Sequence, residues 1–456
     1  MSKEDEPKYN NILKVRDDHL PIAFAEYKPG QFRFKEGTEI SWLSGEEFGL
    51  KELRNRIEPW LTSLFQSEHL SFLAGSGLTH AVHYLATDKP AAGMGAVALS
   101  CHEAEINKAA AETAEAAGRS QGNFEDQLRS ANELVRGLEI LGSKDADTLR
   151  KDLKTILTQF SASILACEAG IAAADESKRE LAFNTLVTFL MSFASRTGTR
   201  DRLSIFTTNY DRLIEAGAEL AGLHLLDRFV GSLMPIFRSS RLDLDMHYNP
   251  PGIRGEPRYL EGVARFTKLH GSVDWVHAGN DIRRIGLPFG AAKVDAYLGT
   301  PGMTDVDANR LMIYPNSAKD RETSDYPYVE LFRDLAAAVC RPNSTLVTYG
   351  YSFGDEHINR VIRDMLTIPS THLVVMSYDD PLGRIMNSYK EFGRPSQISL
   401  LIGPALSDIR TLTENFLPKA AIDRTTFRMS ELLKQRFGTS MSEKRASEHT
   451  TDGDAA

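Results

Sequence analysis

Four short clusters of glycine and polar residues each follow an apolar run in this sequence, at residues 75–77, 207–211, 268–272 and 349–359. Their residue types suit distinct tasks. Small residues let a backbone approach a phosphate, an asparagine amide can hold a hydroxyl group or a water, and a histidine can accept a proton near neutral pH. Ligands of open parallel sheets bind outside the carboxyl ends of the strands, so we expect the clusters to form one site there.

The first cluster, Gly75-Ser76-Gly77, follows the apolar run Leu70–Ala74 and precedes a helical pattern at Leu78–Ala86. Glycines at such a turn let the backbone approach a pyrophosphate, and amides at the helix N-terminus can hydrogen-bond it. Ordinary strand-to-helix turns have the same pattern, so the residues alone leave phosphate binding and a structural turn equally open.

The second cluster, residues 207–211 (TTNYD), places polar side chains at the end of an apolar run. Asn209 could hold a ribose hydroxyl or a water through its donor and acceptor groups. The structural alternative is that Asp211 caps the following helical segment, RLIEAGAEL, and that Asn209 makes a turn.

The third and fourth clusters supply a histidine and a second glycine-framed hydroxyl. His270 can act as a general base, and the glycine after it permits a sharp turn that exposes the ring. Gly350 and Ser352 suit the edge of a nucleotide site. Asp355 and Glu356 are typical of a helix cap whose charges complement the helix dipole.

The elements that must position these clusters alternate between strands and helices. We predict strands at Leu70–Ala74, Leu203–Asn209, Val263–Gly271, Arg310–Pro315, Ser344–Gly350, Thr371–Tyr378 and Gln397–Gly403. Helical patterns at residues 328–340 and 356–366 lie between later strands. This alternation favours parallel pairing through right-handed crossovers. We therefore predict an α/β fold, a Rossmann-like doubly wound parallel sheet.

The composition is that of an ordinary soluble protein, 42% hydrophobic and 25% charged, and 456 residues suffice for a sizeable core. The net charge of -9 shows no excess of basic residues of the kind that nucleic-acid-binding proteins have, so we expect no direct nucleic-acid binding. Cys101, Cys167 and Cys340 are too scattered for a disulfide framework or a zinc knuckle. We see neither a secretion signal nor a membrane-spanning run and expect a cytoplasmic location.

In order and spacing, the four clusters resemble the sirtuin motifs Gly-Ala-Gly-x-Ser, Thr-Gln-Asn-x-Asp, His-Gly and Gly-(Thr/Ser)-Ser. Here they stand as residues 74–77 (AGSG), 207–211 (TTNYD), 270–271 (HG) and 350–352 (GYS). FTTNYD, KLHGS and GYSFGDEHINRVI are particularly similar to sirtuin-like NAD-hydrolysing proteins of bacterial anti-phage defence systems, including those paired with a HerA-type ATPase. The resemblance covers roughly Leu70 to Tyr378 and implies a sirtuin-type fold that binds NAD.

The resemblance also implies roles for single residues. Asn209 would position the nicotinamide ribose or the attacking water, and His270 would be the catalytic base. The other implied NAD contacts are Gly75, Ser76 and Gly77 for the pyrophosphate, Thr208 and Asp211 for the wall beside Asn209, and Gly350 and Ser352 for the adenosine half.

Departures from the deacetylating sirtuins shift the expected chemistry. The chain lacks their four-cysteine zinc module, Thr208 replaces their glutamine, and no Ile-Pro-Asp-Phe-Arg segment follows the glycine motif. We expect NAD cleavage with water, giving nicotinamide and ADP-ribose without zinc. The rivals are a module that senses NAD or ADP-ribose without cleaving it, an NAD-dependent protein deacylase, and a nicotinamide dehydrogenase, which would leave the His-Gly motif without a purpose.

The implied biological role is that of a toxic effector in abortive infection, acting by NAD depletion, as a homo-oligomer docked on a HerA-type hexameric ATPase. The helical region offers an interaction surface, or it merely covers the sheet. The predicted segments are an N-terminal extension (1–60), the first part of the sirtuin-like domain (61–100), a helical insertion (101–200), the rest of that domain (201–405), a C-terminal helical segment (406–438) and a disordered tail (439–456).

Overall fold

The computed structural model describes residues 9–419, except 36, 39, 44, 92–96, 117–123, 195–200, 241–244, 249–257, 261 and 299–325. The strand predicted at Arg310–Pro315 and the predicted tail lie outside the described residues. So does most of the predicted C-terminal helical segment.

An 11-stranded sheet forms the centre of the described chain, and its longest continuous part is parallel. The strands of this part are buried apolar runs for the most part, as expected where helices cover both faces. In spatial order they are β17 (Ile398–Ile402), β16 (His372–Ser377), β15 (Ser344–Tyr349), β5 (His69–Ala74), β6 (Ser204–Thr207), β12 (Val263–Lys268) and β7 (His224–Leu226). This mostly parallel sheet confirms the predicted α/β fold class.

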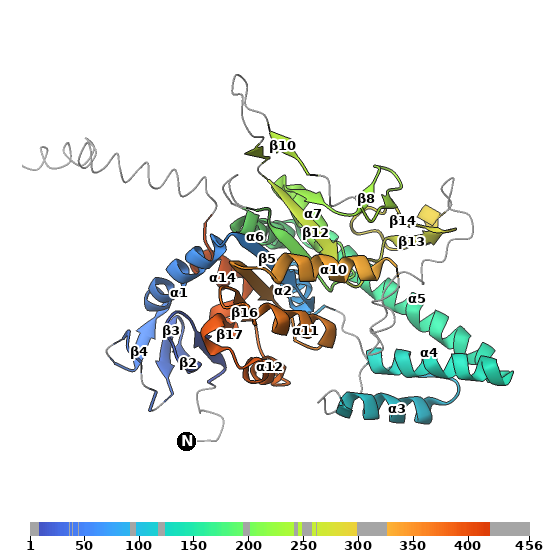
Figure 1. The fold of residues 1–456 in the computed structure, drawn as a ribbon, viewed down its shortest axis with the longest axis horizontal. Helices are drawn as coiled ribbons and strands as arrows, with labels where there is room; N and C mark the ends of the chain where they lie inside the picture. The colour runs from blue at the N-terminus through green and yellow to red at the C-terminus, as the bar shows by residue number, and fades with distance from the viewer. Residues whose placement is uncertain are drawn as a thin grey trace, which may run out of the picture.

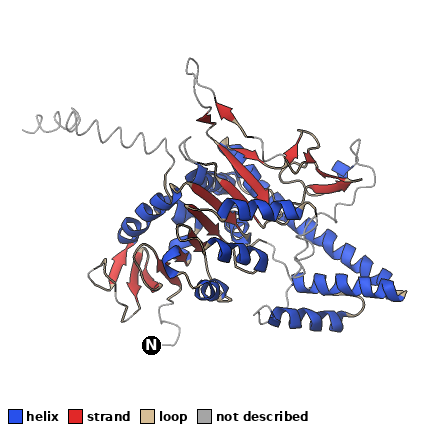
Figure 2. Cartoon of the chain, viewed as in Figure 1, coloured by secondary structure: helices blue, strands red, loops and turns tan. Residues whose placement is uncertain are grey.

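Helices cover both faces of the sheet, as Figure 2 shows. Alternate side chains of β5 point to opposite layers, with Phe72 in one hydrophobic cluster and Leu73 in the other. The Phe72 layer contains α1 (Leu50–Phe65), α2 (Ser76–Thr87), α6 (Glu176–Ala194), α7 (Leu213–Ala221), α13 (Pro404–Ser407) and α14 (Ile409–Asn415). The Leu73 layer contains α10 (Tyr328–Val339), α11 (Glu356–Met365), α12 (Arg384–Phe392) and part of α5 (Asp145–Ala172).

The N-terminal segment extends the sheet beyond β17. Its strands are antiparallel, and they are β1 (Asn11–Lys14), β2 (Ile22–Lys28), β3 (Gln31–Phe34) and β4 (Glu47–Gly49). The sequence predicted only an N-terminal extension (1–60) here, without these strands. The strands are short, and phenylalanines from different strands hold them together, with Phe34 and Phe48 stacked 4.1 Å apart between centroids. Because these contacts join residues from different strands, no single segment of the sequence shows a pattern that predicts its strand.

The predicted helical insertion contains two packing units. α3 (Glu103–Ala116), α4 (Phe124–Leu141) and the first half of α5 share a small core of their own and extend from the sheet as an arm (Figure 1). α6 instead packs in the main core, with Phe189 and Phe193 against Phe72. By length and composition α5 is apolar enough to cross a membrane, a helix that was not expected from the sequence, and 28% of its apolar window is buried. One such helix is weak evidence for a membrane span, and parts of α5 pack in the arm and against the sheet.

Smaller elements complete the described chain around β12. A four-stranded antiparallel sheet is formed by two strands that precede β12 in the chain and two that follow it. Its strands are β8 (Phe229–Val230), β9 (Ile236–Phe237), β13 (Trp275–Ala278) and β14 (Asp281–Arg284). The remaining elements are the hairpin of β10 (His247–Tyr248) and β11 (Arg258–Tyr259), the helix α8 (Asp295–Leu298) and the 3-10 helix η3 (Pro395–Gln397).

Candidate functional site

The four sequence clusters lie at the carboxyl ends of adjacent strands, β15, β5, β6 and β12. The parallel strands that come next in the chain after β5, namely β6, β7 and β12, lie on one side of it, whereas the later strands β15, β16 and β17 lie on the other side. The order of strands therefore reverses between β5 and β15. This is the position at which open α/β sheets bind their ligands.

The glycines at this reversal point allow two loops to touch backbone to backbone. Gly75 N donates to Tyr349 O at 3.0 Å, and Gly77 N donates to Gly350 O at 3.1 Å. A Cβ on Gly75 would lie 2.3 Å from Gly350 O, and one on Gly77 would lie 2.5 Å from Gly350 Cα. Gly350 also has a φ of +61°, which side chains rarely adopt. The glycine turn therefore has a structural cause of its own, at the start of α2.

A cleft of about 560 Å³ opens beside this contact, a size typical of sites for small molecules. Among the residues predicted to contact NAD, Ser76, Gly77, Gly350 and Ser352 line it. The other side of the cleft was not predicted from the sequence, and it includes Tyr84 from α2, Tyr378 and Asp379 after β16, and Arg384 at the start of α12. These residues carry no recognisable local motif. Only the order of the strands brings them to the glycine turn.

Asn209 lies in a buried polar network beside Gly75. Its Nδ2 donates to Gly75 O at 2.9 Å and to Thr79 Oγ1 at 3.0 Å, and Thr79 Oγ1 donates to Asp211 Oδ2 at 2.6 Å. Both amide hydrogens of Asn209 are thus engaged, and its Oδ1 has no partner among the described residues. This oxygen can accept a hydrogen bond from a ligand. No local sequence pattern distinguishes Thr79 from the other residues of α2.

Thr208 and Asp211 flank Asn209 in different ways. Thr208 is partly exposed, and its N–H donates to Ala74 O at 3.2 Å, which continues the pairing of β6 with β5. Asp211 is buried, and its Oδ1 accepts from Leu213 N at 3.0 Å in the first turn of α7. Asp211 therefore supports the start of the helix with one oxygen and binds Thr79 with the other.

His270 is buried and lies within ion-pairing distance of Asp355, for which the sequence predicted only a role in capping a helix. His270 Nε2 lies 2.9 Å from Asp355 Oδ2, and both residues are 5% exposed. Gly271 has a φ of +84°, as the predicted sharp turn requires, but the expectation that this turn exposes the ring is wrong, because the His270 ring is packed in the interior. Asp355 Oδ1 accepts from His357 N and Ile358 N, which confirms that Asp355 caps α11.

The loops of Asn209 and His270 are joined through their backbones. Leu269 N donates to Thr207 O at 2.8 Å, and Val273 N donates to Tyr210 O at 3.0 Å. Within the described chain no hydrogen bond joins the Asn209 side chain to His270. The structure thus places Asn209 and Asp211 together through Thr79, Gly77 beside Gly350, and His270 beside Asp355.

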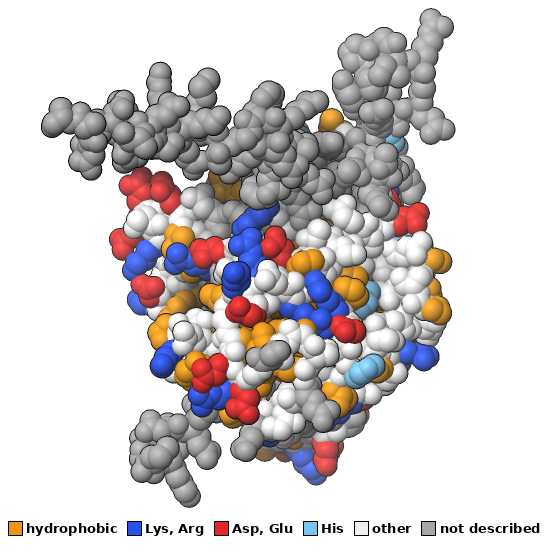
Figure 3. Space-filling view, turned by 90° about the vertical axis from the view of Figure 1, so that its left-hand side faces the viewer, with side chains coloured by type: hydrophobic (Ala, Val, Ile, Leu, Met, Phe, Trp, Pro, Cys, Tyr) orange, Lys and Arg blue, Asp and Glu red, His pale blue; other side chains and the backbone are white. Residues whose placement is uncertain are grey.

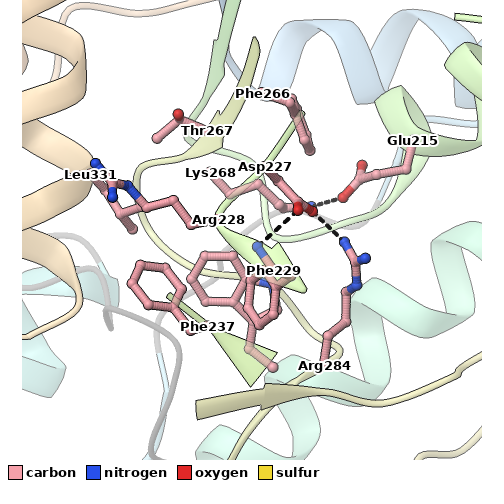
Figure 4. Close-up of a pocket in the computed structure, with 11 residues that line it drawn as sticks. Glu215, Asp227, Arg228, Phe229, Phe237, Phe266, Thr267, Lys268, Arg284 and Leu331 are labelled. Carbon is pink, nitrogen blue, oxygen red and sulfur yellow. Dashed lines mark hydrogen bonds and ion pairs between the residues drawn. The ribbon is translucent and has the colours of Figure 1, made fainter. Parts of the chain in front are cut away.

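Charged groups that are buried or partly buried lie near these loops (Figure 4). Lys268 Nζ donates to Asp211 O and to Glu215 Oε1, and Asp227 pairs with Arg284 close by. Burial raises the pKa of Glu215 to about 7, although the nearby Lys268 ammonium opposes this shift. The buried Lys268 at the end of β12 therefore ties the strand end before His270 to the Asp211 loop and to Glu215.

The helix α5 also contacts the Asn209 loop. Glu168 accepts from Arg212 N at 2.7 Å and pairs with the Arg212 guanidinium, and both side chains are buried. Phe160 of the same helix packs edge-on against Tyr210, with centroids 5.5 Å apart. The inner half of α5 thus supports the residues that flank Asn209. Within the described part of the chain, no group of three or more His, Cys, Asp or Glu side chains could hold a metal ion.

Comparison with known families gives one match. Residues 203–392 match the model of the SIR2-like domain, a segment that runs from β6 to α12 and includes Asn209, His270, Gly350 and Ser352 but not the glycine turn. The match supports a sirtuin-like domain and suggests an enzyme that uses NAD. No curated protein matches the chain.

Proposed function

We propose that this protein hydrolyses NAD at the bond between nicotinamide and ribose, releasing nicotinamide and ADP-ribose. The observation that carries the proposal is that the four clusters follow four adjacent strands around the reversal point of the sheet. Asn209 is hydrogen-bonded to Gly75 of the glycine turn, and the loop of His270 is joined to the loop of Asn209. The SIR2-like match over residues 203–392 supports the choice of NAD as the ligand.

The chemistry of the bond explains what these residues would do. Loss of neutral nicotinamide leaves positive charge on the ribose, so the site needs an oriented water, a base and restricted access to bulk solvent. Gly75 and Thr79 fix the Asn209 amide, and its Oδ1 would hold the ribose hydroxyl or the water. His270 would accept the proton of that water. The adjoining cleft would hold the adenosine half.

The proposal is tested by incubating the purified protein with NAD and measuring free nicotinamide by chromatography. We expect release that falls about 10²- to 10⁴-fold in His270→Ala and Asn209→Ala, the usual range for loss of a general base or a comparable group. His224→Ala, an exposed histidine on the edge strand β7, is the matched control and should keep full activity. Release that survives both site substitutions would contradict the proposal.

A second candidate is binding of NAD or ADP-ribose without turnover. It is favoured by the burial of His270 and Asp355, since a reacting water has to reach the base. Calorimetric binding of NAD with no nicotinamide release, under any condition tested, would support this sensor. A deacylase predicts release only when an acyl-lysine peptide is added, which the same assay detects.

We further propose that the protein is the toxic effector of an anti-phage defence complex, a homo-oligomer docked on a HerA-type hexameric ATPase. The support is the similarity of FTTNYD, KLHGS and GYSFGDEHINRVI to defence proteins of this kind. During phage infection, cells with the wild-type chain should lose NAD and cells with His270→Ala should keep it. Copurification with an ATPase encoded by a neighbouring gene, followed by mass measurement, tests the assembly.

A further inference from the structure

We propose that Asp355 is a positioning residue for His270: its carboxylate keeps the imidazole proton on Nε2, so that Nδ1 is the nitrogen that accepts a proton. The inference rests on the proposed function, in which His270 is the base. It adds a residue to which the sequence analysis gave only a capping role.

The pairing follows from the chemistry of the two groups. His270 Nε2 and Asp355 Oδ2 are 2.9 Å apart, and both residues are almost fully buried. An ionised carboxylate can only accept hydrogen bonds, so the facing nitrogen must carry the proton. Little water competes for this bond, and hydrogen bonds are electrostatically stronger in such surroundings. The contact therefore selects one tautomer of neutral His270.

Asp355 is itself held in place by the loop that follows β15. Its Oδ1 caps α11 by accepting from His357 N at 3.0 Å and Ile358 N at 3.4 Å, and its carbonyl lies 3.1 Å from Tyr351 Oη. Tyr351 Oη also lies 3.0 Å from Asn359 Oδ1 on α11. One oxygen of Asp355 therefore caps the helix, and the other lies at hydrogen-bonding distance from the imidazole.

A cap alone does not require aspartate at this position. Serine, threonine and asparagine cap helices about as well. Aspartate is the one among these residues whose side chain can be ionised, so that its second oxygen is an anionic acceptor for His270 Nε2. The same loop contributes Ser352 to the cleft, so Asp355 connects the position of the base to the wall of the binding site.

Asp355→Asn separates the two roles, because asparagine keeps the cap and the volume. Its amide can present N–H groups to Nε2, which would move the imidazole proton to Nδ1, as occurs when the aspartate of a histidine–aspartate pair is replaced by asparagine. We expect kcat for nicotinamide release to fall about 10²- to 10⁴-fold, with KM little changed. The Asp355→Asn, His270→Ala double variant should be no slower than His270→Ala alone.

The decisive readout is the tautomer of His270, measured by nitrogen NMR on the full chain with labelled histidine. The His270 signals are identified by their loss in His270→Ala. We expect the Nε2–H tautomer in the wild type and a shift toward Nδ1–H in Asp355→Asn. Asp355→Ser, which retains a capping hydroxyl but not the carboxylate, provides a second variant, and thermal unfolding shows that each variant is folded.

The arm of the protein offers a matched control. His102 Nε2 lies 3.1 Å from Asp145 Oδ2 in an exposed pair, so Asp145→Asn removes the same kind of contact away from the site. Nicotinamide release should be unchanged in this variant, and an equal loss there would overturn the inference.

An unchanged His270 tautomer in both Asp355 variants would also overturn it, whatever happens to the rate. If the wild type releases no nicotinamide but the tautomer shifts as expected, the proposed function fails while the positioning of His270 by Asp355 is supported.

Discussion

At the scale of single residues, the site uses carboxylates that each perform two tasks. Asp211 supports the start of α7 and binds Thr79, while Asp355 caps α11 and binds His270. From the sequence, capping and function stood as alternatives for Asp211, and capping was preferred for Asp355. The two oxygens of a carboxylate make both roles compatible, which no local pattern can reveal because the partners lie up to 132 residues away.

Glu215 is the residue whose ionisation should affect stability near neutral pH. Its folded pKa of about 7 lies above the ordinary value of 4.5, so folding favours its protonated form. The wild type should therefore lose stability as the pH rises from about 4.5 to about 7. Glu215→Gln abolishes this titration, and its unfolding free energy relative to wild type should rise by on the order of 1 to 3 kcal/mol between pH 5 and pH 8.

Urea unfolding at a series of pH values measures this difference. Glu219→Gln, an exposed position on the same helix, is the control and should follow the wild type at every pH. If the Glu215→Gln and wild-type curves stay parallel from pH 5 to pH 8, the raised pKa of Glu215 is wrong.

At the scale of elements, the strands that were predicted well from the sequence are those that consist of a continuous run of mostly apolar, buried residues. β5, β15, β16 and β17 are of this kind, and the polar clusters mark where β5 and β15 end. The β1–β4 strands were missed because their stability comes from contacts between segments. The cause of the glycine turn was missed for the same reason, since the backbone that excludes a side chain at Gly75 belongs to Gly350.

The contact of α5 with the Asn209 loop should be a major source of stability. Glu168 is 2% exposed, and burial raises its pKa while Arg212 opposes the shift. Glu168→Gln would leave the Arg212 guanidinium buried beside a neutral amide. Breaking a buried pair from one side costs roughly 3 to 5 kcal/mol, so we expect a loss of this order in the free energy of unfolding.

Urea unfolding of Glu139→Gln gives the comparison for this prediction. Glu139 pairs with Arg150 on the exposed surface of the arm, where loss of an ion pair costs less than about 1 kcal/mol. Equal losses in the free energy of unfolding of the two variants would show that the buried Glu168–Arg212 pair stabilises the protein no more than an exposed ion pair does. Nicotinamide release measured on folded Glu168→Gln would then report how far α5 positions the Asn209 loop.

At the scale of the whole molecule, the N-terminal strands and the parallel sheet form one continuous body. On the face shown in Figure 3, acidic and basic side chains are interspersed with apolar ones, without a large patch of one sign. On the side of the N-terminal strands, the sheet is held by buried polar contacts. Lys14 Nζ donates to Ile398 O at 3.1 Å, and Asn11 Oδ1 accepts from Ala405 N at 2.9 Å.

Deleting residues 1–20 should therefore affect the entire protein. It removes β1, which pairs with β17 from Ile12 to Lys14, and it leaves the edge of β17 open to pairing with other chains. It also exposes apolar side chains that face Leu13, which is fully buried. We expect a lower unfolding temperature and concentration-dependent association in size-exclusion chromatography, whereas a variant that begins at Tyr9 keeps β1 and should match the wild type. Equal unfolding temperatures for the two deletions would mean that the parallel sheet is stable without its N-terminal neighbour.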